Sequence, residues 1–396
     1  MKVLLFGTGM QGKAALHDLL SNDAATTIVA ADREIVPLEE FVARAGYGSR
    51  VRCVACDAAD GECVDNLVAE RPDVILDLLP VPLHDTVTAA AVRRTVHLVN
   101  ASYPSPLMRE LAGDARDRGI AILPEMGMDP GIDLVLLGEA ARSLDSVDGI
   151  VSYGAGFPEA AAAGNPIGYK VTWSFEGVLE SYVRPARVIR GGRVVAISGE
   201  DLFAPENIHS LAIDGVGTVE AFPNGDALHY AELLGMDRSR LRRLERCVLR
   251  WPGHAAFWKK LVALHLLDGE PVVVDGVAVD RKKFLAAAIE PHIGYGEEER
   301  DVVVVRIDVT GRKDGRPHRV FHQVIDRRDR GTGFAAMART VGFSAAIGAR
   351  MVVDGTITGC GLLTPLCDVP FEPFVRELAK RKIEVHCESG PSPRNG

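Results

Sequence analysis

The sequence lacks any run of about 18 or more uncharged apolar residues, the length that a membrane-spanning helix needs. Its first residues, MKVLLFGTGMQG, lack the small-residue cleavage site of a secretory signal peptide. The formal charge of -9 is spread along the chain without long clusters of lysine and arginine, which disfavours nucleic acid or a membrane surface as a partner. We therefore expect a globular, cytoplasmic protein that acts on a small molecule.

The chain also lacks the cysteine pattern of a disulfide framework. Its seven cysteines, an odd number, are spread over 396 residues, which favours free thiols. Cys53, Cys56 and Cys63 have a spacing that zinc-binding thiolates can use, but no second CxxC or HxxxH follows them. The run VRCVACD, residues 51–57, is more typical of a buried strand. We predict free thiols and no metal site.

Residues 1–128 alternate short apolar runs with segments in which apolar residues recur at helical spacing. Apolar strands joined by helices of this length indicate a parallel sheet covered on both faces. Six such runs fit a doubly wound dinucleotide-binding fold, the Rossmann domain. The predicted strands are KVLLF (2–6), TTIVAAD (26–32), VRCVACD (51–57), DVILDLLP (73–80), VHLVNAS (96–102) and GIAILPEM (119–126).

Residues 129–355 follow a different pattern, which predicts an α+β domain for substrate binding, catalysis and oligomerisation. A helical segment, IDLVLLGEAARSL, precedes runs that favour a mixed, largely antiparallel sheet. Its long apolar strands offer edges that need covering, so we expect a homodimer or larger homo-oligomer. Residues 356–390 are expected to pack back on the first domain. The predicted strands are GIVSYGAGF (149–157), YKVTWSF (169–175), a hairpin turning at Gly191-Gly192, and two long strands that turn at 313–316.

A glycine fingerprint, Gly7-Thr8-Gly9-Met10-Gln11-Gly12, directly follows the first predicted strand and opens a helix. Gly7 permits the tight turn, Gly9 lets the backbone approach a pyrophosphate, and Gly12 allows close packing of helix and strand. Asp32 lies 20 residues after Gly12, at the end of the second strand, where a carboxylate can accept hydrogen bonds from the adenosine ribose. This context, rather than the glycines alone, predicts a dinucleotide site.

Asp32 would repel a ribose 2′-phosphate and therefore favours NAD, whereas Arg33 beside it could pair with such a phosphate and leaves NADP possible. Asp57 and the Leu79-Pro80 turn stand where further strands end, on the side where such folds bind ligands. The residues that we assign to the cofactor are Gly7, Gly9, Met10, Gln11, Gly12, Asp32, Arg33, Asp57, Leu79, Pro80 and Ser102.

The stretch LPEMGMDPGID, residues 123–133, surrounds a rigid Pro130-Gly131 turn with acids at the end of the sixth strand. Asp129 is well placed as the N-cap of the next helix, and an ionised carboxylate on this rim could also orient or deprotonate an amine. Tyr103, after the fifth strand, could hydrogen-bond a substrate nitrogen or simply cover the sheet edge. The predicted catalytic residues are Asp129 and Tyr103, with Glu125 ranked second and Asp133 as a structural acid.

Cations in the second domain are candidates for holding substrate carboxylates. Lys170 lies in NPIGYKVTW, and Arg184 and Arg187 lie in YVRPARVIR. Each of them could equally be a solvated surface charge. The predicted substrate-binding residues are Lys170, Tyr169, Trp173, Arg184 and Arg187.

Segments spread over nearly the whole chain resemble the saccharopine dehydrogenase family, which includes glutamate-forming saccharopine reductases and lysine 6-dehydrogenases. They are GTGMQG, NASYPSPLM, EMGMDPGID, NPIGYKVTWSFEGVLESY, RPARVIRGGRVV, VEAFPNGD, LRWPGHAAFWKKL and MARTVGFSAAIGARM. GMDPGID, NPIGYK and AFPNGD resemble the reductases, whereas RPARVIR, RWPGHA and MARTVGFSAAI resemble lysine 6-dehydrogenases. Reductases that use NADP resemble one another in having a small neutral residue before the arginine, where this sequence has Asp32.

The resemblance implies an NAD(P)-dependent oxidoreductase that acts on the ε-amine C–N bond of lysine or a lysine derivative and yields 2-aminoadipate 6-semialdehyde. The leading prediction is an NAD-linked lysine 6-dehydrogenase, and the alternative is a saccharopine dehydrogenase that forms L-glutamate. Asp129 and Tyr103 would handle protons and hold the amine. Another amine substrate, such as carboxynorspermidine, stays open. A non-catalytic NAD(P)-binding sensor is a further alternative, which Tyr103 and Asp129 beside an intact fingerprint disfavour.

Overall fold

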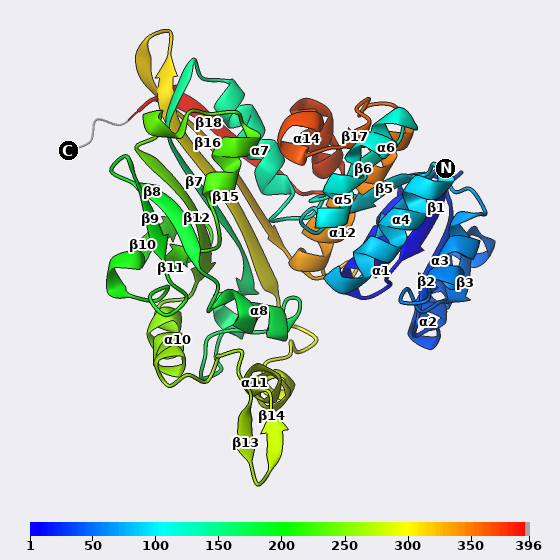
Figure 1. Cartoon of the computed structure of the whole chain (residues 1–396), viewed down its shortest axis with the longest axis horizontal. Coiled ribbons are helices and arrows are strands. Elements are labelled where there is room, and N and C mark those ends of the chain that lie inside the picture. The colour runs from blue at the N-terminus through cyan, green and yellow to red at the C-terminus, as the bar shows by residue number, and fades with distance from the viewer. Residues whose placement is uncertain (393–396) are drawn as a thin grey trace. The chain divides into compact units, whose positions relative to one another are not determined.

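The computed structural model describes residues 1–392, which form two compact units (Figure 1). The nucleotide unit contains Met1–Gly138 and Ala338–Glu384, and the second unit contains Glu139–Met337 and residues 385–392. Helices α7 (Ile132–Arg142) and α12 (Ala336–Val353) run from one unit into the other. The boundaries between the units therefore lie inside these helices rather than at the expected residues 128 and 355. Each helix packs partly in one unit and partly in the other, which the sequence pattern does not reveal.

The nucleotide unit contains a seven-stranded sheet in which every pair of strands is parallel, in the order β17-β6-β5-β4-β1-β2-β3. The six predicted strands are all present, and the Rossmann prediction is confirmed. The seventh strand, β17, has only two residues and gives no periodic signal. The strands are β1 (Lys2–Phe6), β2 (Thr27–Asp32), β3 (Val51–Ala55), β4 (Val74–Asp77), β5 (His97–Asn100), β6 (Ala121–Leu123) and β17 (Gly361–Leu362).

Helices pack their apolar residues against this sheet (Figure 1). Leu4 and Phe6 of β1, for example, share one buried cluster with Val87 and Ala91 of α4. Burying these apolar side chains is the main term that favours folding. The helices of this unit, besides α7 and α12, are α1 (Met10–Ser21), α2 (Val36–Ala45), α3 (Gly61–Val68), α4 (His84–Arg94), α5 (Pro106–Glu110), α6 (Ala112–Asp117), α13 (Pro365–Asp368) and α14 (Phe371–Lys380).

A buried ion pair ties the end of α14 to helix α1. Arg381 donates to both carboxylate oxygens of Asp18, with Nε–Oδ1 at 2.5 Å and Nη2–Oδ2 at 2.8 Å, and both side chains are almost fully buried. Burial raises the pKa of Asp18, although the hydrogen bond and charge of Arg381 lower it. The pair helps to hold the C-terminal segment on the first unit, because removing one partner would leave the other charge buried and uncompensated.

The second unit contains a nine-stranded mixed sheet, as the sequence predicts. Its main path is β10-β11-β12-β7-β15-β16-β18, with the β8–β9 hairpin joined to β12. Only β12 and β7 pair in parallel. The strands are β7 (Ser146–Pro158), β8 (Ala186–Arg190), β9 (Arg193–Ile197), β10 (His209–Ile213), β11 (Gly217–Pro223), β12 (Arg243–Arg250), β15 (Asp301–Lys313), β16 (Arg316–Arg327) and β18 (Val385–Pro391).

A small hairpin, β13 (Val272–Val274) and β14 (Val277–Val279), projects from this unit beyond helix α11 (Figure 1). Three of the helices cover an aromatic cluster that includes Tyr182, Phe222 and Trp258. The helices of the unit are α8 (Phe175–Ser181), α9 (Leu228–Leu233), α10 (His254–Ala263) and α11 (Arg281–Ile289).

Residues 169–175 do not form the predicted strand. The Asn165 side chain accepts hydrogen bonds from the backbone N–H groups of Ile167 (3.1 Å) and Tyr169 (3.3 Å) and donates to the Tyr169 carbonyl. Ser174 caps helix α8 by accepting from the Gly177 N–H. These bonds use backbone groups that a strand would pair with a neighbour, so the segment is a loop that leads into a helix.

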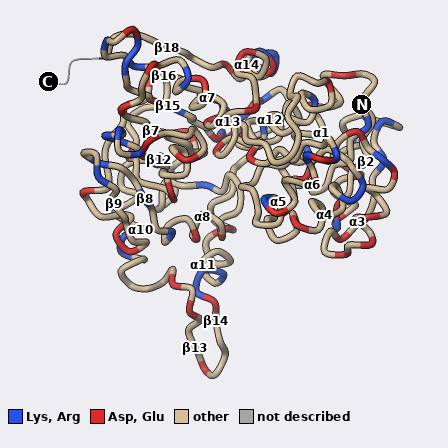
Figure 2. Tube along the Cα trace, turned by 45° about the horizontal axis from the view of Figure 1, so that its top comes forward, with Lys and Arg blue, Asp and Glu red and all other residues tan. Residues whose placement is uncertain are grey.

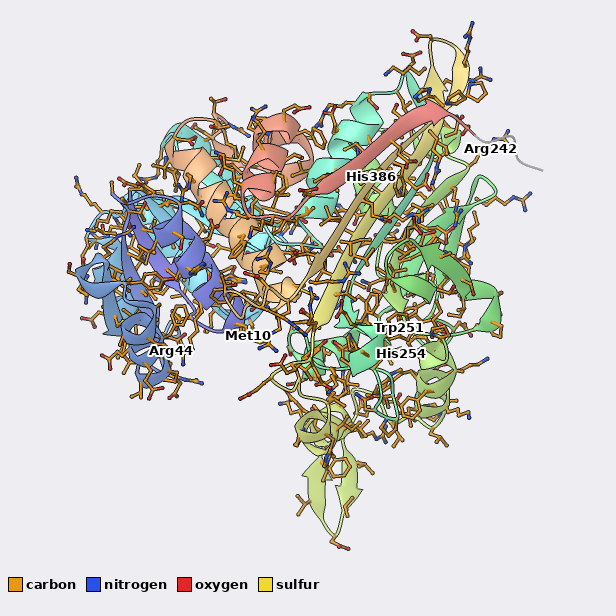
Figure 3. All side chains as sticks on the ribbon, turned by 180° about the vertical axis from the view of Figure 1, so that it is seen from behind. Met10, Arg44, Arg242, Trp251, His254 and His386 are labelled. Atoms are coloured by element: carbon orange, nitrogen blue, oxygen red, sulfur yellow. A yellow bond between two sulfur atoms is a disulfide. The ribbon has the colours of Figure 1, made fainter. Side chains whose placement is uncertain are left out.

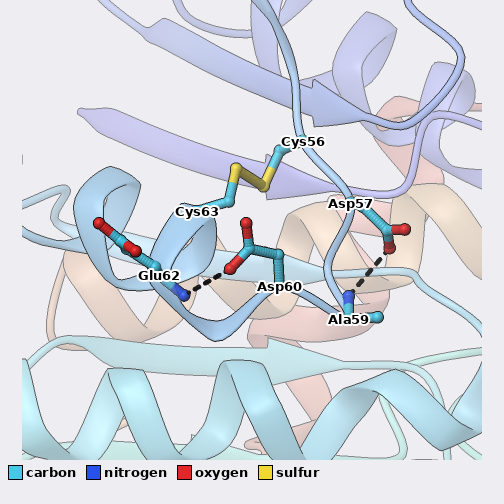
Figure 4. Close-up of a disulfide and its surroundings, with 6 residues drawn as sticks. All are labelled: Cys56, Asp57, Ala59, Asp60, Glu62 and Cys63. Carbon is cyan, nitrogen blue, oxygen red and sulfur yellow. Dashed lines mark hydrogen bonds between the residues drawn. A yellow bond between two sulfur atoms is a disulfide. The ribbon is translucent and has the colours of Figure 1, made fainter.

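Cys56 and Cys63 form a disulfide between the end of β3 and helix α3 (Figure 4), so the prediction of free thiols is wrong for this pair. Asp60 accepts from the Glu62 N–H and begins α3. This turn brings the two Cα atoms to 6.0 Å, a separation that a disulfide spans. Cys53, Cys247 and Cys360 are free thiols. Within residues 1–392, no group of three or more His, Cys, Asp or Glu is arranged to hold a metal ion.

Charges of both signs are interspersed over each unit (Figure 2). A search of the described residues finds no helix with the length and hydropathy needed to cross a membrane.

We expect Asp18→Asn to lower the free energy of unfolding by about 3–5 kcal/mol, because it leaves the buried Arg381 guanidinium without its carboxylate. Denaturant titration measures the change. Lys380→Met, which removes an exposed cation paired with Glu377, is the matched control and should change stability by less than about 0.5 kcal/mol. Equal losses in the two variants would contradict the role given to the buried pair.

Candidate functional site

The glycine loop between β1 and α1 has the geometry of a phosphate-binding turn. Gly7 has φ +82°, and a Cβ there would lie 2.6 Å from the Leu78 carbonyl oxygen. A Cβ on Gly12 would lie 2.0 Å from the Gly7 carbonyl oxygen, whereas one on Gly9 would meet no atom within 4 Å. No side chain caps the N-terminus of α1. The residues present therefore fit a dinucleotide, with open space at the glycine that should face its pyrophosphate.

Asp32 joins the glycine loop to the end of β2. Its Oδ2 accepts from the backbone N–H of Thr8 at 2.6 Å and from the Thr8 hydroxyl at 2.7 Å, and its Oδ1 accepts from the Glu34 N–H at 3.1 Å. Partial burial opposes ionisation of Asp32, but the Thr8 hydrogen bonds hold its pKa below the ordinary value. Arg33 is largely exposed, and its Nε lies 3.9 Å from Glu34 Oε1. The carboxylate is thus ionised at the place predicted for the adenosine ribose.

The other predicted cofactor residues lie at the same edge of the sheet, where the parallel strands end. Met10 is exposed on the first turn of α1, with the partly buried Gln11 beside it. Asp57 is exposed and accepts from the Ala59 N–H. Leu79 and Pro80 follow β4, and Ser102 follows β5. Only contacts with a bound cofactor would test their roles, which therefore stay predictions.

A hydrogen-bonded chain that we did not predict runs from β4 to Ser102. Asp77 and His84 are buried, and Asp77 Oδ2 lies 2.7 Å from His84 Nδ1. His84 Nε2 lies 2.9 Å from the Ser102 hydroxyl. Asp77 comes from the end of β4, His84 begins α4 and Ser102 follows β5. The spacing of these residues in the sequence does not predict the arrangement, because each of the three side chains comes from a different element.

The loop with the predicted catalytic acids is closed by its own backbone. Gly127 N–H donates to the Pro130 carbonyl at 3.0 Å, and a Cβ on Gly131 would lie 2.1 Å from the Gly127 carbonyl oxygen. Glu125 is buried, has φ +64° and donates its N–H to the Ser102 carbonyl at 2.9 Å. Asp129 is partly buried, and Tyr103 is 44% exposed. These three candidates therefore belong to loops that follow β5 and β6.

The prediction that Asp129 is the N-cap of the following helix is wrong. Helix α7 begins at Ile132, which puts Gly131 rather than Asp129 at the cap position. The buried Asp133 accepts from the Gly131 N–H at 2.7 Å. Asp133 is therefore the structural acid of this turn, as expected, and Asp129 stays a candidate for catalysis.

In the second unit, two of the predicted substrate cations already have acidic partners. Lys170 Nζ lies 2.7 Å from Glu299 Oε2 and also donates to the Gly294 carbonyl. Arg187 pairs with Asp226. Arg184 is exposed, and Trp173 packs on Gly177 of α8. Tyr169 is fully buried, and its hydroxyl has no hydrogen-bond partner among the described residues.

Sequence reasoning missed Arg250, the last residue of β12. Arg250 is 5% exposed, and within residues 1–392 no carboxylate lies within 4.0 Å of it. Its Nη1 donates to the Leu249 carbonyl, and its Nε has no partner in the described part of the chain. The Tyr169 ring centroid lies 4.9 Å from its guanidinium carbon. A buried guanidinium that lacks an anion has spare donors for a ligand carboxylate.

Aromatic side chains orient Arg250. Tyr182 lies close enough to Arg250 to interact with its charge, and the Tyr182 hydroxyl lies 2.6 Å from His254 Nε2. Burial and the Arg250 charge hold the pKa of His254 well below its ordinary value. His254 Nδ1 faces the Ile167 carbonyl, so Nδ1 carries the proton and Nε2 accepts from Tyr182. His254 lies near Trp251, where β12 ends and α10 begins (Figure 3).

Comparison with known families identifies the chain. A model of the saccharopine dehydrogenase NADP binding domain matches residues 3–123, and a model of the saccharopine dehydrogenase C-terminal domain matches residues 127–383. The chain belongs to the saccharopine dehydrogenase family. The resemblance that its motifs predict is confirmed, and the chain is an oxidoreductase that uses a nicotinamide cofactor. The matching domain model supports NADP in particular, which we expected to be possible but ranked below NAD.

Two relatives and one solved structure illustrate the similarity. The chain is 27% identical to saccharopine dehydrogenase [NADP(+), L-glutamate-forming] of Saccharomyces cerevisiae, over 95% of this chain and 96% of that one. It is 27% identical to the mitochondrial alpha-aminoadipic semialdehyde synthase of Bos taurus, over 98% of this chain but 48% of that protein. A structure of apo saccharopine dehydrogenase (L-Glu forming) from Saccharomyces cerevisiae has 26% identity, a TM-score of 0.84 and coverage of 98% and 99% of the two chains.

We expect Asp32→Asn to raise the affinity for NADPH relative to NADH by about tenfold or more, because it removes a negative charge near the expected 2′-phosphate while an amide oxygen can still accept from Thr8. Fluorescence titration with both reduced cofactors measures the ratio. Glu34→Gln, which removes an exposed charge from the same turn, is the matched control. An unchanged ratio in Asp32→Asn would refute the proposed influence of this carboxylate on cofactor choice.

Proposed function

We propose that this protein is an L-glutamate-forming saccharopine dehydrogenase that uses NADP. The names of its full-length yeast relative and of the similar solved structure support this activity. They favour the alternative that we derived from the sequence over the leading prediction, lysine 6-dehydrogenase. The reaction would oxidise the secondary amine of saccharopine and, with water, yield L-glutamate and 2-aminoadipate 6-semialdehyde.

The observation that carries this proposal is Arg250. Saccharopine has a glutaryl arm with two more carboxylates than lysine, so its site needs cations that are not already paired. Lys170 and Arg187 have acidic partners within the chain, whereas among the described residues the buried Arg250 contacts a carbonyl and aromatic side chains but no carboxylate. A substrate carboxylate would supply the missing counter-charge. The buried hydroxyl of Tyr169 could donate a further hydrogen bond to this carboxylate.

The nicotinamide cofactor would supply the hydride acceptor, and the residues of the chain would bind the substrate and manage its protons. The secondary ammonium must first lose a proton, because only a nitrogen lone pair can form the iminium. Asp129 and Tyr103, on loops at the carboxyl edge of the nucleotide sheet, are the residues that we propose for holding this nitrogen. Water then adds to the iminium carbon, and the C–N bond to glutamate breaks.

Steady-state assays should show NADPH formation from saccharopine, and consumption of NADPH when semialdehyde and glutamate are mixed. We expect kcat/KM for saccharopine to exceed that for lysine by about 10² or more, because a site built for extra carboxylates leaves Arg250 unpaired when lysine binds. The same assays with ammonia in place of glutamate and with NAD in place of NADP are the controls. Comparable rates with lysine and saccharopine would overturn the proposal.

Arg250→Met should raise KM for saccharopine about 10²-fold, because a charge-assisted hydrogen bond contributes about 1.5–3 kcal/mol. Affinity for NADPH should change by less than about twofold, since Arg250 lies outside the nucleotide unit. Arg238→Met, at an exposed arginine of the same unit, is the matched control. A KM unchanged in Arg250→Met, in protein whose melting temperature shows it to be folded, would remove Arg250 from the substrate site.

A further inference from the structure

We propose that Ser102, His84 and Asp77 form a proton relay, in which the Ser102 hydroxyl accepts the proton of the substrate amine and His84 stores it. This inference rests on the proposed function, because it concerns amine oxidation. It starts from the two short contacts that join the three side chains, 2.7 Å between Asp77 and His84 and 2.9 Å between His84 and Ser102.

The hydrogen-bond partners fix where the protons lie. Asp77 Oδ1 accepts from the Leu79 N–H at 3.1 Å, and its Oδ2 faces His84 Nδ1. An ionised carboxylate only accepts, so Nδ1 carries the proton of the neutral imidazole and Nε2 has the lone pair. The Ser102 hydroxyl must then donate to Nε2. Its only hydrogen points inward, which leaves the oxygen lone pairs of Ser102 to accept from a ligand.

Burial makes the inner part of the relay suitable for holding a proton. Asp77 is 0% exposed and His84 is 2% exposed, whereas Ser102 is only partly buried. Water therefore does not compete for the imidazole, and Asp77 at 2.7 Å stabilises the imidazolium when it forms. The Thr88 hydroxyl bonds the His84 carbonyl at 2.8 Å and helps to fix the start of α4.

The exposed end of the relay lies among the loops that carry the catalytic candidates. Ser102 immediately precedes Tyr103, and its carbonyl accepts from the Glu125 N–H at 2.9 Å. Its N–H donates to Asn100 Oδ1 at 3.0 Å, which holds the residue at the end of β5. Ligands of doubly wound folds bind at the carboxyl ends of the strands. The hydroxyl is therefore on the ligand side of the sheet.

The relay supplies a step that the reaction needs. The substrate ammonium donates an N–H proton to Ser102 Oγ while the original Ser102 proton passes to His84 Nε2. One N–H bond breaks, one N–H bond forms on imidazole, and the substrate nitrogen keeps the electron pair. The water that adds to the iminium brings two protons, which with the remaining N–H complete the ammonium of the departing glutamate. His84 passes its stored proton back through Ser102 to solvent as the net proton of the oxidation, and so ends the cycle neutral. Ser102 is thus the catalytic residue, and His84 and Asp77 act through it.

Other ionisable groups lie near the relay and on the elements packed against it. Asp77 lies on β4, Asp85 follows His84 in α4 and accepts from the Ser105 hydroxyl, and Tyr103 and Glu125 lie in the neighbouring loops. Helix α3, packed on α4, carries Glu62 and Asp65, and Asp65 is paired with Arg93 and Arg94.

The test compares Ser102→Ala, Ser102→Thr and Asp77→Asn with wild type in saccharopine oxidation. We expect Ser102→Ala to lower kcat about 10²-fold at saturating NADP, the usual contribution of a general base. Saturation separates this loss from any loss of cofactor binding by Ser102. Ser102→Thr keeps the hydroxyl and should recover kcat to within about tenfold of wild type. Asp77→Asn favours the wrong imidazole tautomer and should lower kcat while the protein stays folded.

Ser105→Ala is the matched control, because Ser105 lies in the same loop and bonds a carboxylate, Asp85, outside the relay. Its kcat should stay within about twofold of wild type, since its hydroxyl caps α5 instead. An unchanged kcat in Ser102→Ala, or weaker NADPH binding alone, would overturn the relay.

A second measurement does not depend on the substrate. Nitrogen-15 spectra of the NADPH-bound protein report the tautomer of His84, which is assigned by the signal lost in His84→Gln. A proton on Nδ1 is expected, and a proton on Nε2 of the neutral ring would overturn the relay even if saccharopine is the substrate. If wild type oxidises another amine instead, the proposed function fails while the same variant ratios still test the relay.

Discussion

Parallel pairing of β1 with β2 and β4 is the constraint on which the nucleotide unit depends. Buried backbone N–H and C=O groups must be paired, and pairing in one direction brings the carboxyl ends of these strands to the same edge. Gly7, Asp32 and Asp77 meet there although they are far apart in the chain. The same edge receives the loops after β5 and β6, so the glycine loop, the Asp77–His84–Ser102 chain and the catalytic candidates share one rim.

Buried charges in the two units differ in what compensates them. Asp18 is held by the bidentate Arg381, and Asp77 by His84 and the Leu79 N–H, so both are satisfied within the chain. Arg250 has a carbonyl, Tyr182 and an aromatic face beside it, but no anion among residues 1–392. Because leaving a buried charge without a partner is costly, a fold keeps such a residue where a ligand completes it. This contrast separates structural charges from the proposed carboxylate site.

The choice between lysine and saccharopine depends on the same reasoning. In the proposed reaction both substrates would offer an ε-nitrogen to the same residues, so the proton chemistry proposed for Ser102, Tyr103 and Asp129 does not distinguish them. The glutaryl arm does, because its carboxylates need spare donors. Lys170 looks suitable in the sequence, yet Glu299 already neutralises it. We therefore expect Arg250, rather than the residues that handle protons, to discriminate between the two substrates.

The sequence by itself determined the six main strands of the Rossmann sheet, the glycine loop with Asp32, the two hairpins of the second sheet and the family. These features follow from local patterns, because strand periodicity, turn glycines and motif spacing can each be recognised within a short contiguous stretch of sequence. Tertiary structure alone decided the Cys56–Cys63 disulfide, the two-residue β17, the Asp77–His84–Ser102 chain and the lone charge of Arg250. Each of these features depends on which side chains from separate elements come into contact, and on which side chains find no partner. The packing of the whole unit determines these contacts.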